Sequence, residues 1–363
     1  MKYKSCHALE YFGLVFYGHD HRISLCCPLN LPPDAGPGVD NTLPPKETFV
    51  ALNKLRAEII SDNIKKAISP CSEENAKALF SCEDCFQLRS GDHSVGGDGL
   101  IHSVTLGFYP SPCQCKCIYC GIHRDPRNKT IDADSKEKYK KSIEIVKYAI
   151  ENNLIAPNAS WSVSGGEITI HPFKGEIYAL TRGRNAMYFT NCFLFDEQIA
   201  ENLAENPNSS MFLSIDAGTP ETWAKVKGVP NFEQVCDNLV KYYSYTTKAS
   251  QIIFKYIILP DVNDNISDFT EVAKIMEVLE TEKMHISRDQ LSLEGRESEL
   301  MPERKIPDSE RASYVKKELE GAGMLWAILQ KHGRNRINFS TYSQDELNEI
   351  YEIAKSLLES GKI

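Results

Sequence analysis

The segment Pro112-Cys-Gln-Cys-Lys-Cys-Ile-Tyr-Cys-Gly121 carries four of the 12 cysteines of the chain. Three of them, Cys113, Cys117 and Cys120, have the spacing CxxxCxxC. Three thiolates can hold a cubic iron–sulfur cluster and leave its fourth iron free, whereas an electron-transfer ferredoxin closes all four irons with cysteine. An open iron offers a Lewis-acidic, redox-active site to a small chelating ligand. The spacing therefore predicts a cluster that takes part in chemistry.

A structural zinc site is the alternative interpretation of the same cysteines. Short cysteine clusters in a reducing compartment are often zinc ligands. Zinc-binding pairs, however, usually come as CxxC on each side of a longer loop, so the spacing favours the cluster. Cys115 is the surplus thiol, and we interpret it as a spacer within the loop.

The composition is that of a globular protein, with 42% apolar and 25% charged residues in a chain of 363. No apolar run approaches the roughly 18 residues that would span a bilayer. The start, Met1-Lys-Tyr-Lys-Ser-Cys6, lacks the apolar stretch of a secretory signal, so we expect a cytoplasmic protein without a membrane partner. A net charge of −9 would repel a phosphate backbone, which disfavours a nucleic-acid partner. Cysteines in such a chain fit metal ligation better than disulfides.

The first hundred residues differ from the rest of the chain. Glycines and prolines are dense between positions 28 and 45, which disfavours long regular elements there. One helix is expected from about Glu47 to Ile68, where apolar residues recur at helical spacing. We therefore place a domain boundary near Leu100, with a small loop-rich, cysteine-containing domain over residues 1–100 and a second domain over residues 101–363.

From Ile101 onward, short β-rich runs alternate with amphipathic helices, which predicts an α/β fold of parallel strands joined by crossover helices. The six expected strands are Ile101–Phe108, Ala159–Ser164, Ala186–Thr190, Met211–Asp216, Gln251–Leu259 and Met284–Arg288. Capping patterns predict helix starts at Asp134, Asp268 and Ser343. In such folds the active groups gather at the carboxyl ends of the strands. The cysteine segment directly follows the first expected strand.

The cysteine triplet, with the aromatic Tyr119 just before its last cysteine, resembles the signature of the radical S-adenosylmethionine (SAM) superfamily. The resemblance implies a partial (β/α)6 barrel of the TIM type, with C-terminal helices. It implies a catalytic [4Fe-4S] cluster on Cys113, Cys117 and Cys120, with SAM chelated to the open iron. It further implies that one electron, from a small donor of the flavodoxin or ferredoxin type, yields a 5′-deoxyadenosyl radical that removes a substrate hydrogen. The protein is then an enzyme, either an oxidoreductase or a transferase.

Other residues resemble the SAM-binding positions of that family. The run Ser164-Gly165-Gly166-Glu167 ends the second expected strand and resembles the GGE motif, in which two glycines let the backbone approach SAM and Glu167 faces its ammonium. A tight turn is the alternative interpretation. The further cofactor-binding candidates are Tyr119, Ser214, Lys255 and Arg288. Either of the two cations could meet the carboxylate of SAM, although a lysine on an alternating strand more often extends to solvent.

Asn191 and Asp216 are the catalytic candidates. Thr190-Asn191-Cys192 closes the third expected strand and is similar to the Thr-Asn-Gly of the family, so Asn191 either contacts substrate or caps a turn. Ser214-Ile-Asp216 resembles the Ser-x-Asp of relatives, in which the aspartate points at the substrate cavity. A buried aspartate at a strand end is costly unless it is paired, which favours a functional role. We therefore expect the substrate to lie near both side chains.

A second metal site is expected in the first hundred residues. Its candidate ligands are Cys6, Cys26 or Cys27, Cys82 and Cys85. The run from Leu9 to Leu25 reads as a hairpin, and a hairpin that ends in cysteine with a distant CxxC resembles the SPASM or twitch auxiliary domain. This resemblance implies a second, closed [4Fe-4S] cluster. In most relatives the domain follows the barrel, whereas here it precedes it. A zinc site on the same cysteines is the alternative.

The combined prediction is a radical SAM enzyme with an N-terminal SPASM-like site. An auxiliary cluster favours oxidative modification of a peptide or protein side chain, and a radical methyltransferase or a glycyl-radical activase are alternatives within the family. The alternative from another class is a non-catalytic zinc-binding or iron–sulfur electron-transfer protein. An electron carrier needs no SAM pocket, so the Ser164–Glu167 run separates the two classes. The scattered histidines are interpreted as surface or packing residues, apart from His7, which follows Cys6 and stays open as a possible ligand.

Overall fold

The computed structural model describes residues 2–18, 22–25, 38–68, 89–92, 98–120, 124, 130–289 and 306–363. The chain forms two compact units. Unit 1 comprises residues 1–111 and 129–187, and unit 2 comprises residues 112–128 and 188–363. The cysteine segment therefore belongs to unit 2, although the strand before it belongs to unit 1.

Unit 1 is built on a sheet with the strand order β7-β6-β2-β3-β4. Strands β6 (Ile101–Phe108) and β7 (Ile155–Val163) are parallel, and β2 (Gly13–Gly18) adds a parallel strand on the other side of β6. Strand β3 (Arg22–Ser24) pairs antiparallel with β2, which confirms the predicted hairpin, and β4 (Gly38–Asp40) pairs with β3. The N-terminal hairpin therefore extends the sheet that carries the first expected strand.

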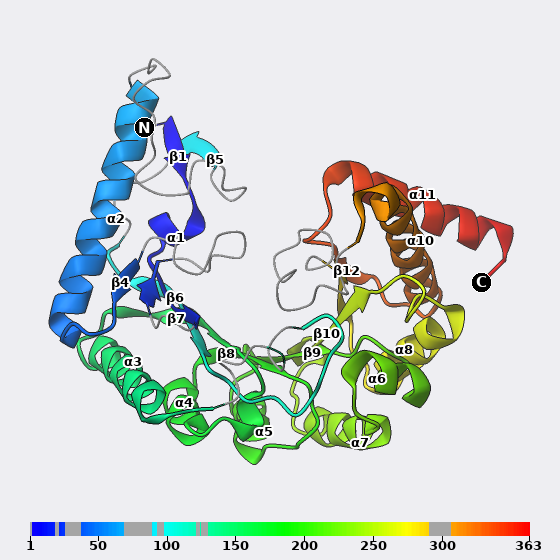
Figure 1. The fold of residues 1–363 in the computed structure, drawn as a ribbon, viewed down its shortest axis with the longest axis horizontal. Helices are drawn as coiled ribbons and strands as arrows, with labels where there is room; N and C mark the ends of the chain where they lie inside the picture. Colours follow the sequence, from blue (N-terminus) through cyan, green and yellow to red (C-terminus); the bar gives the residue numbers. More distant parts are fainter. Residues whose placement is uncertain are drawn as a thin grey trace. The chain divides into compact units, whose positions relative to one another are not determined.

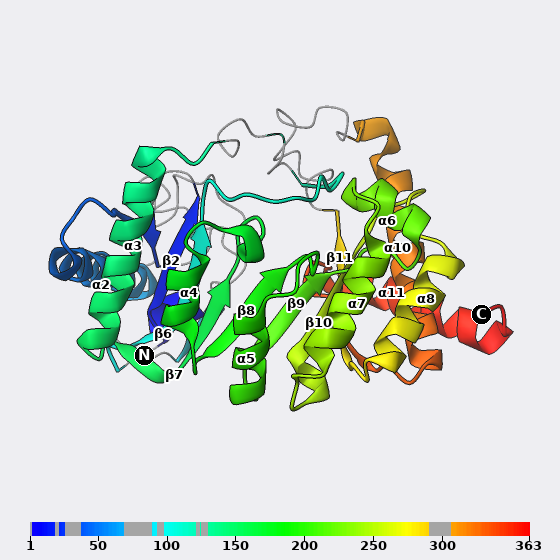
Figure 2. The same cartoon turned by 90° about the horizontal axis from the view of Figure 1, so that it is seen from below.

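Two helices of unit 1, those from Pro45 and from Ala133, begin close to their predicted positions, and the others were not expected from the sequence. The helices of this unit are α1 (His7–Glu10), α2 (Pro45–Ile68), α3 (Ala133–Glu151), the short 3-10 helix η3 (Ile168–Ile170) and α4 (Lys174–Thr181), and a separate ladder joins β1 (Lys2–Ser5) to β5 (Arg89–Asp92). Helix α3 is capped by Asp132, whose carboxylate accepts a hydrogen bond from the Ser135 amide at 2.8 Å, so the predicted cap at Asp134 is wrong by two residues. Helices α3 and α4 cover one face of β6 and β7 (Figure 2).

Unit 2 contains a second run of parallel strands, with the order β12-β11-β10-β9-β8. These are β8 (Asn185–Thr190), whose last three residues belong to this unit, β9 (Ser210–Ser214), β10 (Ile252–Ile258), β11 (Lys283–Arg288) and β12 (Arg336–Asn338). Strand β10 reads as a nearly continuous apolar run and is buried at every position except Lys255. Such runs are typical of central parallel strands, which are covered on both faces.

Helices follow the strands of unit 2 in sequence. They are α5 (Glu197–Glu205), α6 (Pro220–Lys227), α7 (Phe232–Tyr243), the 3-10 helix η4 (Ala249–Gln251), α8 (Ile266–Val278), α10 (Asp308–Lys331) and α11 (Gln344–Ser360). Helices α10 and α11 lie side by side (Figure 1), and α10 also packs on α8 and β10. Helix α10 was not expected from the sequence. Helix α11 begins with the predicted capping box of Ser343 and Glu346.

Helix α8 begins earlier than predicted. Asn265 is its cap and accepts from the Asp268 amide at 3.0 Å, so the predicted cap at Asp268 is wrong. The Asp268 carboxylate instead accepts hydrogen bonds from the turn that precedes α6, including the Gly218 amide at 2.8 Å and the Thr222 hydroxyl at 2.6 Å. The Asp268 carboxylate therefore belongs to a tertiary hydrogen-bond network, whereas the local sequence pattern predicted that it caps its own helix.

The predicted fold class is confirmed: six parallel-type strands alternate with helices in the order expected for the partial barrel. Strands β6 to β11 each lie within a few residues of their predicted bounds. The division into residues 1–100 and 101–363 stays a prediction. No helix in the described part of the chain is both long and apolar enough to cross a membrane.

Candidate active site

The cysteine loop lies against the C-terminal end of α6. The Lys116 amide donates to the carbonyl of Lys227 at 2.8 Å, and the Ile118 amide donates to the carbonyl of Val226 at 2.9 Å. The last carbonyls of a helix have no partner within the helix. The loop supplies those partners, so the backbone between Cys113 and Cys120 is fixed by the end of a helix.

Gly228 makes this close approach possible. It follows α6 in the left-handed conformation, with φ of +68°, which glycine adopts without strain. A Cβ atom at this position would lie 2.8 Å from the Cβ of Lys116 and 2.9 Å from its carbonyl oxygen. Any side chain here would therefore push the cysteine loop away from α6.

The thiols of the loop form a connected set. Cys113, Cys117 and Cys120 are partly buried, and Cys115 is 2% exposed. A hydrogen bond from Cys115, helped by the charge of Lys227, outweighs burial and lowers the pKa of Cys117 to about 6. Hydrogen bonding to Cys113 and Cys117 raises the pKa of Cys115 above its usual range. Cys117 is therefore a thiolate at neutral pH, whereas Cys115 keeps its proton.

This donor set fits an iron–sulfur cluster. Thiolates are the protein ligands of such clusters, and each binds a different iron of the cube. Among the described residues, no three His, Cys, Asp or Glu side chains are grouped to hold a single metal ion.

Tyr119 is held by a buried ion pair. The Nζ of Lys227 lies 2.5 Å from Oδ2 of Asp216, and both side chains are almost completely buried. The Tyr119 hydroxyl lies 2.5 Å from the same carboxylate oxygen and accepts a hydrogen bond from Lys227 at 2.6 Å. Burial alone would lower the pKa of Lys227, but the Asp216 carboxylate raises it overall. Burial, together with the Asp216 charge, raises the pKa of Tyr119.

Asp216 is fixed on its other side as well. Its Oδ1 accepts from the Ile257 amide at 2.6 Å, and its carbonyl accepts from the Asn263 side chain at 2.9 Å. Its φ of +46° lies in the left-handed region, where residues other than glycine are strained. These contacts assign Asp216 to holding Tyr119 and the cysteine loop. Its predicted contact with substrate stays a prediction.

Asn191, the other catalytic candidate, lies against the cluster loop. Its Nδ2 is 3.7 Å from the Sγ of Cys113, and its Oδ1 accepts from the Gln114 side chain at 3.4 Å. The structure therefore brings Asn191 to a predicted cluster ligand. The predicted contact of Asn191 with substrate stays a prediction.

Two cofactor-binding candidates share one face of the unit 2 sheet. Ser214 of β9 pairs in register with Lys255 of β10, which pairs with His285 of β11. Partners in register point to the same face of a sheet. Burial lowers the pKa of Lys255, and this lysine makes no hydrogen bond or ion pair with any residue that the structure describes. The Lys255 ammonium on this face of the sheet can therefore accept an anionic ligand.

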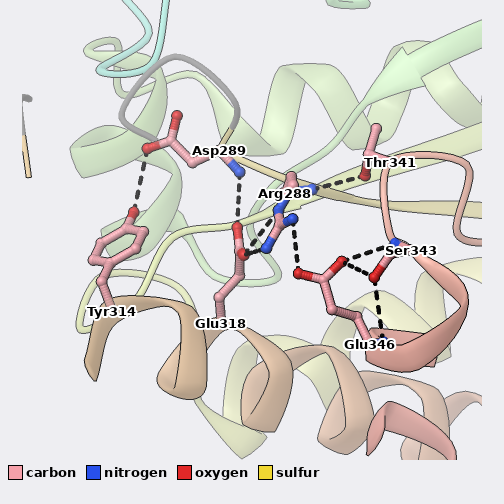
Figure 3. A network of polar contacts seen from close by, with 7 residues as sticks. All are labelled: Arg288, Asp289, Tyr314, Glu318, Thr341, Ser343 and Glu346. Atoms are coloured by element: carbon pink, nitrogen blue, oxygen red, sulfur yellow. Dashed lines mark hydrogen bonds and ion pairs between the residues drawn. The ribbon is translucent and has the colours of Figure 1, made fainter. Parts of the chain in front are cut away.

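Arg288 lies in a different environment. Its guanidinium bonds Glu318 of α10 at 2.9 Å and Glu346 of α11 at 2.9 Å (Figure 3). It also stacks on the Tyr342 ring at 5.2 Å. The backbone amide of the next residue, Asp289, donates to Glu318 at 3.0 Å. These contacts assign Arg288 to joining β11 to the two C-terminal helices, and its predicted contact with SAM stays a prediction.

The glycine-rich run is described within unit 1. Gly165 and Gly166 both have positive φ, at +95° and +55°. A Cβ on Gly165 would lie 3.3 Å from the Tyr109 ring, and the Gly165 carbonyl accepts from the Ser111 hydroxyl at 2.7 Å. Glu167 is fully buried, and its Oε1 accepts from the Thr169 amide and hydroxyl at 3.1 and 2.8 Å. The run is a tight turn that also holds a buried carboxylate.

Of the candidate ligands of the second metal site, the structure describes Cys6 alone. Cys6 is partly buried and follows β1. Cys26, Cys27, Cys82 and Cys85 lie outside the described residues. The second cluster and the SPASM-like domain therefore stay predictions.

Two residues of the site were missed by sequence reasoning. Lys227 reads as one of two lysines in the last turn of a helix, where cations favour the helix dipole and normally face solvent. Gln114 reads as a spacer between cysteines. No local pattern marks either residue, because their partners Asp216 and Asn191 come from distant strand ends.

The fold is α/β, and the cysteine loop offers thiolate ligands for a cofactor. The family described as the radical SAM superfamily matches residues 112–274, which contain the cysteine loop, Asn191, Asp216, Lys227 and Lys255. These residues form a radical SAM domain, and the match covers less than half of the chain. The family implies a [4Fe-4S] cluster and SAM as cofactors.

Solved structures show distant likeness. SuiB of Streptococcus suis bound to the precursor peptide SuiA has a TM-score of 0.46 and 12% identity, over 96% of this chain and 75% of that chain. SuiB bound to SAM has a TM-score of 0.45 and 15% identity, over 84% and 58%. The radical SAM methyltransferase TsrM of Kitasatospora setae, with cobalamin and a [4Fe-4S] cluster, has a TM-score of 0.40 and 12% identity, over 73% and 62%. No curated protein matches the chain significantly.

Proposed function

We propose that this enzyme holds a [4Fe-4S] cluster on Cys113, Cys117 and Cys120, cleaves SAM reductively and abstracts a hydrogen atom from its substrate. The observation that carries the proposal is the loop of three partly buried cysteines inside the radical SAM match. When bound and reduced, the cluster supplies one electron that breaks the carbon–sulfur bond of SAM, which leaves methionine and a carbon radical that takes hydrogen from the substrate.

The protein's own contribution is to hold the loop rigid. Two backbone hydrogen bonds to the end of α6 fix the loop, and the buried pair of Lys227 and Asp216 fixes Tyr119 next to Cys120. Ligands that are preorganised in this way bind their metal with less ordering cost. The same pair also buries a positive charge near Cys117, which stabilises its thiolate.

Two charged groups support the binding of SAM. The resemblance places the Glu167 carboxylate, which is fully buried beside the glycine turn, at the ammonium of SAM. The glycines before it keep the turn free of side chains, which lets a ligand approach the backbone. Lys255, which makes no ion pair with a described residue and lies within the influence of the Asp216 and Cys120 charges, suits the SAM carboxylate, with Ser214 beside it. We propose these roles for Glu167, Gly165, Gly166, Lys255 and Ser214.

Membership of the family leaves the substrate open. We propose a peptide or protein side chain as the substrate, because a second cluster on the N-terminal cysteines would accept or relay the electron that remains after hydrogen abstraction. We further propose that the enzyme is an oxidoreductase that acts in the cytoplasm with an electron donor of the flavodoxin or ferredoxin type.

Spectroscopy of the reconstituted protein tests the proposal. Dithionite-reduced protein, prepared without oxygen, should show the electron paramagnetic resonance (EPR) signal of a reduced [4Fe-4S] cluster, and adding SAM should change that signal because SAM binds the open iron. A cluster signal that saturating SAM leaves unchanged would contradict an open iron. Colourless protein that binds zinc and no iron would contradict the cluster itself.

A further inference from the structure

Asn191 occupies the turn after β8, with its side-chain amide between Gln114 and the Sγ of Cys113. We propose that Asn191 sets the reduction potential of the catalytic cluster by donating an N–H···S hydrogen bond to Cys113. The inference rests on the proposed function, because it requires that Cys113 is a cluster ligand. It gives Asn191 a role that acts through a cluster ligand, whereas the sequence left open substrate contact or capping of the turn, and the structure shows its oxygen capping the turn at Phe193.

The orientation of the amide follows from its other partners. The Oδ1 of Asn191 lies 2.9 Å from the Phe193 amide and 3.4 Å from the Nε2 of Gln114. The backbone amide can only donate, so it requires the oxygen of Asn191 on its side. The orientation of an asparagine amide is assigned from such partners. The NH2 group is then the one that faces Cys113, at 3.7 Å from Nδ2 to Sγ.

The turn that carries Asn191 is fixed independently of the cysteine loop. Cys192 has a φ of +60° and is fully buried, and its amide donates to the Thr190 hydroxyl at 3.0 Å. The Asn238 side chain of α7 donates to the carbonyls of Cys192 and Phe193 at 3.0 and 3.1 Å. The backbone that carries Asn191 is therefore held in place by contacts outside the cysteine loop, and this fixes where its side-chain amide meets Cys113.

The physical effect has a definite sign. Reduction adds negative charge to the cluster and its thiolates, and a hydrogen-bond donor stabilises the more negative state. An N–H···S bond to Cys113 therefore raises the potential and makes the cluster easier to reduce. A hydrogen bond that is stronger by about 1 kcal/mol to the reduced cluster than to the oxidised one changes the ratio of reduced to oxidised cluster roughly fivefold.

The test is an EPR-monitored redox titration of reconstituted protein without SAM or substrate. Asn191→Ala removes the donor and should lower the ratio of reduced to oxidised cluster about fivefold at a fixed applied potential. Asn191→Asp keeps an oxygen for the Phe193 amide, removes the donor and adds negative charge, so its ratio should fall at least as far. Asn231→Ala is the matched control, because the Asn231 amide bonds the exposed Gln234 and no other residue that the structure describes, and the ratio should stay unchanged.

The outcomes separate this inference from the proposed function. Wild-type protein without a four-iron signal would overturn the proposed function itself. A normal wild-type signal, with either variant titrating like wild type at equal iron content, would overturn the role of Asn191. Loss of the cluster from both folded variants would also overturn it and would assign Asn191 to cluster assembly. A contact with substrate alone would leave the potential of both variants unchanged.

Discussion

The Nζ of Lys227 lies 2.5 Å from Oδ2 of Asp216, and these side chains are 1% and 0% exposed. The pair joins the end of α6 to the end of β9, and both partners reach the Tyr119 hydroxyl in the cysteine loop. Burying two charges costs several kcal/mol per ion unless their geometry and further hydrogen bonds compensate. Here the Ile257 amide and the Tyr119 hydroxyl supply those further bonds. The loop and the ion pair therefore depend on each other.

Replacing one partner of this pair should destabilise the protein strongly. Lys227→Met leaves the Asp216 carboxylate buried and unpaired, which typically costs about 3 to 5 kcal/mol. Adding Asp216→Asn should restore part of the loss, because the neutral amide no longer needs a cation. The free energy of unfolding in urea measures both effects. The control is Lys225→Met, an exposed lysine of the same helical turn. Equal stabilities of Lys227→Met and Lys225→Met would contradict the buried pair.

Gly228→Ala should expel the cluster from a folded protein. The new Cβ meets Lys116 at 2.8 and 2.9 Å, so the cysteine loop must move away from α6. Gly333→Ala is the matched control, because Gly333 has a φ of +72° but open space around its Cβ. Both variants carry the strain of a positive φ, about 1 kcal/mol, and only one displaces the loop. Iron per chain after reconstitution should fall several-fold in Gly228→Ala alone, and equal iron in the two variants would rule out the steric explanation.

Cys115→Ala should keep the catalytic cluster. The thiol of Cys115 stays protonated because hydrogen bonds to Cys113 and Cys117 raise its pKa. Iron and sulfide content, with the EPR spectrum of the reduced protein, should match wild type within a factor of about two. Loss of the cluster would instead show that Cys115 is a ligand, and the spacing CxxxCxxC would no longer describe the site.

Short-range sequence patterns predicted those elements that depend mainly on contacts between residues close in the sequence. The cysteine loop, the glycine turn, six strands and the capping box at Ser343 follow from short-range patterns, and each is present. Asp268 shows where such patterns fail, because its carboxylate serves a tertiary network in place of its own helix. Lys227 was missed for a related reason. A lysine in a last helical turn reads as exposed, and only Asp216, brought near by the fold, turns it inward.

Stability should fall as the pH drops from about 6.5 to about 4. Burial lowers the pKa of His171 from 6.5 to about 4, and its ring packs against Tyr139 and Phe173. Below pH 6.5 the unfolded chain binds a proton that the folded protein excludes, so the folded state loses roughly 3 kcal/mol across this window. His171→Gln should be less stable near pH 7 but should lose less between pH 6.5 and 4. Unfolding in urea at several pH values measures how the free energy of unfolding changes with pH in wild type and in His171→Gln. Equal changes in the two proteins would contradict this origin.

The central claim is that Cys113, Cys117 and Cys120 hold a cluster that cleaves SAM. Its most direct test is the release of 5′-deoxyadenosine from SAM under dithionite, in reconstituted wild type, Cys117→Ala and Cys236→Ala. Cys236 lies on α7 away from the loop and serves as the thiol control. Wild type and Cys236→Ala should release 5′-deoxyadenosine, and Cys117→Ala should release none above background. Continued release by Cys117→Ala, or no release by a wild-type protein that carries its iron, would contradict the account.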